Sequence, residues 1–146
     1  MLFYEALHYM GDELLNRCDG INVFYGFRHP SSFSMNESSQ IVNIYRNSED
    51  DEYVNISIAL WVREDAPDLD RGYEKLATFE QKFFKAIQDL NEELWALEAE
   101  GLFLLDNVQL LSIEIESTAG DDGSLWPAFG SETKLKLRIH RHREVR

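Results

Sequence analysis

The chain has 146 residues, a length typical of one domain, and its 44% hydrophobic content is enough for a core without disulfides or a structural metal. This composition excludes a disordered chain, the single cysteine excludes an internal disulfide, and the lack of an apolar run of about 18 residues argues against a transmembrane helix. Acidic residues near the N-terminus are unlike a secretory signal, so we expect one cytoplasmic domain over residues 1–146.

The formal net charge of −13 is unevenly distributed along the chain. Residues 1–133 hold 8 of the 14 basic and 26 of the 27 acidic residues, whereas residues 134–146 hold six basic residues and one acidic residue. An acidic body of this kind repels a nucleic-acid backbone. One interpretation is that the basic end of one copy meets the acidic body of the next, and the other is a solvated surface with a basic terminus.

The N-terminal elements follow from hydrophobic spacing. Apolar residues at helical spacing predict an amphipathic helix over residues 2–16, which Gly20 ends. Alternation over residues 21–27 predicts a strand. The polar stretch His29–Ser39 has no periodicity and predicts a mobile loop.

A β-hairpin follows that loop. Residues 41–46 read as a short strand, residues 47–52 as a turn, and residues 53–64 as a long strand. One face of the long strand is wholly aliphatic and the other carries Asn, Ser, Trp and Arg, so we expect a sheet with a core side and a more polar side.

The second half of the chain predicts a long helix and two strands. The helix begins near Asp68 or Asp70 and carries an apolar stripe to Leu90, and residues 91–101 read as a separate short helical piece. Residues 108–117 predict a strand. The face of this strand toward the core is expected to carry Leu111, Ile113 and Ile115.

The last strand is expected over residues 134–140, with a buried face and a basic face. Together the elements predict an α+β fold, a mainly antiparallel sheet with two helices packed on one face. Strands that are neighbours in sequence are expected to pair through hairpins, without crossovers.

The stretch DDGSLWPAFG raises the question of an acidic catalytic or metal site. Asp121 and Asp122 are adjacent, so on an extended chain their carboxylates point to opposite faces and do not share a ligand. Asp-Gly between two alternating runs is instead typical of a turn, which we expect Trp126 and Pro127 to anchor to the body.

His140, His142 and Glu144 form a second candidate, because residues two apart on a strand share a face and can share a metal. Lys136 and Arg138 lie on the same face and repel a cation, so an exposed basic edge is the better interpretation. The sequence also lacks nucleophile and phosphate-loop motifs. We therefore expect no enzyme activity, no catalytic residues, no cofactor and no metal.

The C-terminal third resembles the tail terminator proteins of long-tailed phages, and most of all the minor tail protein U family. The likeness consists of an acidic turn, a tryptophan with an alanine two residues on, and an alternating last strand, here Asp121, Asp122, Gly123, Leu125, Trp126, Ala128, Leu135, Leu137 and Ile139. The order of the remaining expected elements agrees with that family over nearly the whole chain. This chain's basic end has no counterpart that we can map to the family.

The resemblance implies a homohexameric ring that sits on the last ring of tail-tube protein, stops polymerisation and joins the tail to head or neck proteins. DNA would pass only as cargo through an acidic lumen, and the subunit would be a virion protein that assembles in the bacterial cytoplasm without a membrane. The candidate contact residues are His29, Ser32 and Phe33 in the loop, Asp50 and Asp51 in the turn, and Arg138 and Arg141 in the last strand, with Asp121, Asp122 and Trp126 as loop anchors.

Two other functional classes stay open at this point. A small acidic binding or inhibitor protein would block a basic partner, and it predicts a monomer or dimer. A metal-dependent enzyme would use the histidines or the aspartate pair, and it predicts stoichiometric metal. The sequence also leaves open whether the chain is a terminator or a neighbouring neck or connector protein.

Overall fold

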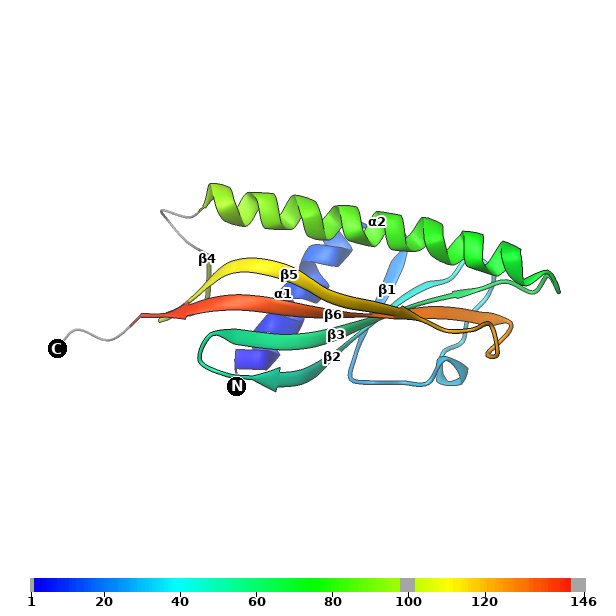
Figure 1. Ribbon diagram of the computed structural model, residues 1–146, viewed down its shortest axis with the longest axis horizontal. Coiled ribbons are helices and arrows are strands. Elements are labelled where there is room, and N and C mark those ends of the chain that lie inside the picture. The colour runs from blue at the N-terminus through cyan, green and yellow to red at the C-terminus, as the bar shows by residue number, and fades with distance from the viewer. Residues whose placement is uncertain (1, 98–101, 143–146) are drawn as a thin grey trace.

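A computed structural model describes residues 2–97 and 102–142 (Figure 1). The elements in chain order are α1 (Leu2–Arg17), β1 (Ile21–Tyr25), the 3₁₀ turn η1 (Pro30–Ser32), β2 (Gln40–Glu49), β3 (Tyr53–Arg63), α2 (Leu69–Ala96), β4 (Leu102–Leu105), β5 (Val108–Gly120) and β6 (Ala128–Arg141). The predicted α+β class is confirmed: the strands form one curled, mostly antiparallel sheet with two helices packed on one face. Figure 1 shows α2 running above the sheet and α1 crossing beneath α2.

The core lies between the helices and one face of β3. Val54, Ile56, Ile58, Leu60 and Val62 are fully buried there, as their alternation predicts. Side chains of α1, α2 and β6 complete this cluster, among them Met10, Phe79, Phe83, Leu135 and Leu137. The apolar faces read from the sequence are therefore the faces that meet.

The helix α2 is longer than predicted. Asp68 caps its N-terminus by accepting a hydrogen bond from the Asp70 amide at 3.0 Å, as expected. The predicted break at Asn91 is wrong, because Leu90 and Leu94 are both buried and continue the apolar stripe through one 28-residue helix. Residues 98–101 of the predicted second piece lie outside the described residues.

The sheet order is β1-β2-β3-β6-β5-β4. Pairing through hairpins alone is wrong at two places, because β1 lies parallel to β2 and β3 pairs with β6, which follows it only after α2, β4 and β5. The chain returns from the end of β1 to the start of β2 through residues 26–39, and the fully buried Asn43 fastens this connection. The Asn43 side chain accepts a hydrogen bond from the Arg28 amide at 3.0 Å and donates to the Phe24 carbonyl at 3.2 Å.

Strand bounds differ from the prediction where bulges occur. Strand β2 runs three residues beyond the predicted end at Arg46, with a register shift between Arg46 and Ser48 that keeps it paired with β3. A second shift between Leu110 and Ser112 changes which residues of β5 face the core. Leu110 and Ile113 are consequently buried, Leu111 is only partly buried, and Ile115 is 45% exposed.

Two further differences concern the C-terminal strands. The short strand β4 was not predicted, and β6 begins at Ala128 rather than at residue 134. The sequence predicted that the basic face of the last strand is an exposed edge, and this is wrong. Strand β6 pairs with β3 on one side and with β5 on the other, so its basic residues lie on the face of the sheet.

The outer face of the sheet, opposite the helices, is the more polar face, as the sequence predicted, but it also carries a small apolar cluster. Trp61 and Ala59 are buried on this face with Ile41 and Ala128, and Phe33 and Met35 from the connection pack over them. The stretch expected to be a mobile loop contains η1 and covers a second, smaller core.

Candidate assembly surfaces

The predicted contact residues fall into two groups at opposite ends of β3. We call residues 27–39 and 121–127, which meet beside Arg63, the loop end, and residues 49–53 and 138–142, which meet beside Tyr53, the hairpin end. The 11 residues of β3 separate the two ends by about 33 Å at 3.3 Å per residue. This division could not be predicted from the amino-acid pattern.

The loop end contains a cleft of about 340 Å³. Its walls include His29, Phe33, Met35, Arg63, Leu125 and Trp126. Arg63 holds the connection against the end of β3, because its guanidinium donates to the Met35 carbonyl at 2.9 Å and to Asp65 at 2.8 Å. The long connection and the acidic turn are far apart in the sequence, but residues of both line this cleft and form one surface.

The three predicted residues of the connection have different environments. The His29 Nδ1 accepts a hydrogen bond from the Ser31 amide at 3.2 Å and caps η1, and the Ser32 hydroxyl donates to the His29 carbonyl at 2.7 Å. The ring of Phe33 packs against that of Phe24 at 4.9 Å. Phe33 therefore anchors the connection to the sheet, whereas the exposed His29 and Ser32 are available to a partner.

Asp121 and Asp122 shape the turn that precedes β6. The two carboxylate oxygens of Asp121 accept hydrogen bonds from the Gly123 and Gly130 amides, each at 2.6 Å. Asp122 accepts from Ser124, and hydrogen bonds from the Ser124 side chain and amide lower the pKa of Asp122. These contacts hold a turn, and neither carboxylate is directed at a shared ligand.

Two aromatic side chains are exposed at the loop end. Trp126 is 47% exposed and its indole N–H donates to the Ala66 carbonyl at 3.0 Å, so it fastens the turn without being buried. Phe27 is 67% exposed, and it borders a second cleft of about 220 Å³ over Tyr45 and Trp61. Large exposed aromatic residues beside clefts are typical of protein-binding surfaces.

Asp50 and Asp51 lie at the tip of the hairpin end. Asp50 accepts hydrogen bonds from the Glu52 and Tyr53 amides, both at 2.8 Å, and these bonds lower its pKa. Asp51 is exposed, and its side chain makes no hydrogen bond to another described residue. Asp50 therefore shapes the turn, and Asp51 is the more available of the two.

A row of basic side chains on the outer face of β6 forms the basic stripe, namely Lys134, Lys136, Arg138 and His140. Lys136 lies over the Tyr53 ring at 5.2 Å, and Arg138 makes no ion pair within residues 2–97 and 102–142. Arg141 belongs to the other face of the strand and pairs with Glu49 at 3.8 Å. The two predicted arginines are thus separated, and only Arg138 belongs to the stripe.

The metal alternative gains no support from the described residues. The rings of His140 and His142 lie 4.6 Å apart, but their planes are almost perpendicular, and His142 contacts Gln109 at 3.1 Å. Within residues 2–97 and 102–142 no group of three potential ligands occurs, and Glu144 lies outside these residues.

Both ends carry acidic residues, and the hairpin end holds Glu49, Asp50, Asp51 and Glu52 beside the last residues of the basic stripe. Acidic residues gather at and beside the loop end, namely Glu37, Glu64, Asp65, Asp68, Asp121 and Asp122, and the Asp65 amide donates to Glu37 at 3.2 Å. The basic stripe runs from the middle of the outer face to the hairpin end. Sequence reasoning missed Phe27, Met35 and Arg63 as members of the loop end, because the parallel return of the connection carries no local signal.

No protein-family model matches the chain, and no curated protein sequence matches it. The chain has a distant likeness to a solved structure from Akkermansia muciniphila, described as lacking its transmembrane region, with 11% identity and a TM-score of 0.37 over 99% of this chain and 86% of that one. Within the described residues, neither helix is both long and apolar enough to cross a membrane. A likeness this distant has no bearing on function, so the surfaces themselves carry the functional argument.

Proposed function

We propose that this chain is a ring-forming tail terminator of a phage or prophage, which caps the tail tube and joins it to head or neck proteins. The observation that carries the proposal is the separation of the basic stripe from the acidic loop end. Arg138 lies level with Tyr53, about 33 Å along β3 from Arg63, so the stripe is too far from the acidic residues of the loop end to pair with them within one chain. The acidic residues near the stripe in its own chain are Glu114, which lies opposite Lys136, and those of residues 49–52. Opposite charges placed this way favour contact between copies.

A contact of the stripe on one copy with the loop end of the next is heterologous, because different surfaces meet. Such contacts close into a ring when the rotation between copies allows it. The family resemblance supports contacts of the ring or the tube at residues 29–39 and 47–52, with Asp121, Asp122 and Trp126 as loop anchors. The ring would be a homohexamer located in the virion, and its remaining acidic surface would repel DNA that passes through the lumen.

The exposed residues outside this contact are assigned to other tail components. Asp51 at the hairpin end is the candidate for contact with tail-tube or neck proteins, whereas His29 and Ser32 belong to the loop end and are candidates for the contact between copies. Loops on a rigid sheet commonly carry such contacts.

Charge reversal in the stripe tests the proposal. Arg138→Glu is expected to lower the solution mass of the assembled protein, whereas Lys85→Glu, which makes the same charge change on the exposed face of α2, is expected to leave it unchanged. Adding Asp122→Lys to Arg138→Glu restores opposite charges between the two surfaces and is expected to restore the mass. Equal effects of Arg138→Glu and Lys85→Glu would contradict the proposed contact, and tight binding of a basic protein by a strict monomer would favour the inhibitor class.

A further inference from the structure

The outer edge of β5 is open over most of its length. Strand β4 pairs with β5 only from Val108 to Leu110, while β6 pairs with the other edge as far as Gly120. No described residue pairs through its backbone with the outer edge from Ser112 to Gly120. An open edge of this kind presents backbone donors and acceptors to an extended chain.

Asn91 already occupies one position of this edge and shows which way its amides point. The Asn91 side-chain oxygen accepts from the Ile113 amide at 2.9 Å, so this amide points away from β6 and toward α2. Backbone groups alternate in direction along a strand, so the Ile115 amide points outward too. Among the described residues, no side chain of α2 accepts a hydrogen bond from the Ile115 amide.

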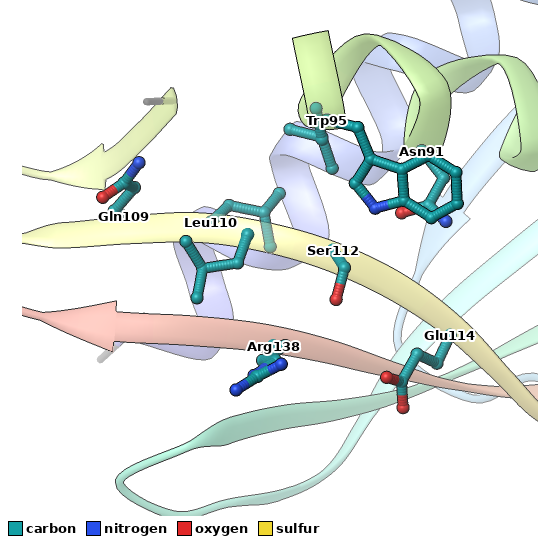
Figure 2. A pocket seen from close by; sticks show the side chains of 9 residues that line it. Asn91, Trp95, Gln109, Leu110, Ser112, Glu114 and Arg138 are labelled. Carbon is teal, nitrogen blue, oxygen red and sulfur yellow. The ribbon is translucent and has the colours of Figure 1, made fainter. Parts of the chain in front are cut away.

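A cleft of about 470 Å³ lies along the first part of this edge. Figure 2 shows Trp95 and Asn91 on the α2 side of β5, and Glu114 and Arg138 on the outer side of the sheet. Trp95 is 61% exposed, and Ile115 extends the apolar side beyond it. The two sides of the edge therefore differ: one is apolar and the other is charged.

The charges on the outer side select the occupant. In the sheet register Glu114 lies opposite Lys136 of β6, so a strand added at the free edge would place one of its residues on the other side of Glu114. A basic residue there continues the alternation of charge across the sheet. A second β5 edge is disfavoured as the occupant, because Glu114 and Glu116 of two copies would face each other, and the register shift at Glu116 also blunts self-pairing.

We propose that the free edge of β5 binds an extended segment of a partner protein as an added strand, with Lys or Arg facing Glu114 and apolar residues facing Trp95. This inference does not depend on ring formation, and the same site would serve a tail component or any other partner with such a segment. Main-chain hydrogen bonds supply the binding, and the two side-chain layers supply the selectivity.

Two matched peptides test the proposal on the full chain. Each has nine residues, Thr-Val-Thr-Val-Lys-Val-Thr-Val-Thr, or the same sequence with Glu in place of Lys, and both ends are blocked. Hydrogen exchange is expected to slow in Ser112–Gly120 when the Lys peptide is added, and not in the other edge strand, β1. The Lys peptide is expected to bind about fivefold more tightly than the Glu peptide, the range of a good cross-strand charge pair.

Three variants separate this site from general attraction to an acidic protein. Glu114→Lys is expected to reverse the preference between the peptides, whereas Asp12→Lys, the same charge change on the exposed surface of α1, is expected to preserve it. Trp95→Ala is expected to weaken both peptides alike. The proposal is overturned if Ser112–Gly120 gain no protection, or if Glu114→Lys and Asp12→Lys change the preference equally.

Discussion

Gly130 lies directly against the indole ring of Trp61. A Cβ atom at Gly130 would lie less than 3.0 Å from three atoms of that ring, a separation that real side chains do not adopt. Gly130 and Trp61 are cross-strand partners on the outer face of β6 and β3. The glycine therefore allows the large ring to lie flat on the sheet and form the second core beneath the loop end.

Gly130→Ala is expected to destabilise the protein by about 1–3 kcal/mol, because the buried ring must move to make room. Gly120→Ala is the matched control, since a Cβ at Gly120 meets nothing within 4 Å. Urea unfolding of both variants measures the difference in the free energy of unfolding. Equal stability of the two variants would show that Trp61 is not held against Gly130.

Trp126→Phe is expected to cost about 1 kcal/mol, because it removes the hydrogen bond to Ala66 while keeping an aromatic ring at a half-exposed position. Truncation of a fully buried aromatic anchor would cost more, about 3–5 kcal/mol. Trp95→Phe serves as the control, because Trp95 is exposed and its indole makes no hydrogen bond within the described chain. A loss of several kcal/mol on Trp126→Phe would mean that Trp126 is buried in the folded protein.

Asp50 is expected to make the hairpin end sensitive to acid. Its amide partners at Glu52 and Tyr53 hold the folded pKa below the ordinary value of 3.8, so its stabilising effect is present above that value and is lost as the pH falls through the folded pKa. Asp50→Ala should therefore be less stable than the parent protein at neutral pH and lose less stability on acidification. Urea midpoints from neutral pH to below 3.8 measure this, with Asp51→Ala as the exposed control. If the acid dependence of Asp50→Ala matched that of the parent protein, Asp50 would not be ionised in these hydrogen bonds.

The parts of the fold that could be predicted are those with a strong local pattern. The alternation from Val54 to Val62 identifies β3, and the apolar stripe from Leu76 to Leu90 identifies α2, because each pattern matches the period of one element. The sequence narrows the cap of α2 to Asp68 or Asp70, because a capping side chain acts within its own turn, and Asp68 is the cap in the structure.

The parts that could not be predicted depend on tertiary contacts. The bulge at Leu111 has no marker in the sequence. It shifts by one position which residues of β5 face the core and which face outward. The buried position of Trp61 depends on the connection folding over the outer face, and the parallel pairing of β1 depends on Asn43, a polar residue within an otherwise apolar strand. For the same reason the predicted contact residues include both structural and exposed side chains. Phe33 packs on Phe24 and Asp50 accepts a backbone hydrogen bond, whereas Arg138 is exposed.

The most direct test of the proposed function is the solution mass, measured by light scattering after size exclusion over a range of protein concentrations, with and without magnesium. We expect a mass near six times the 17.0 kDa of one chain, or a monomer that converts to this mass with concentration or cation, because divalent ions screen the repulsion between acidic subunits. A strict monomer at high concentration in both conditions would contradict ring formation.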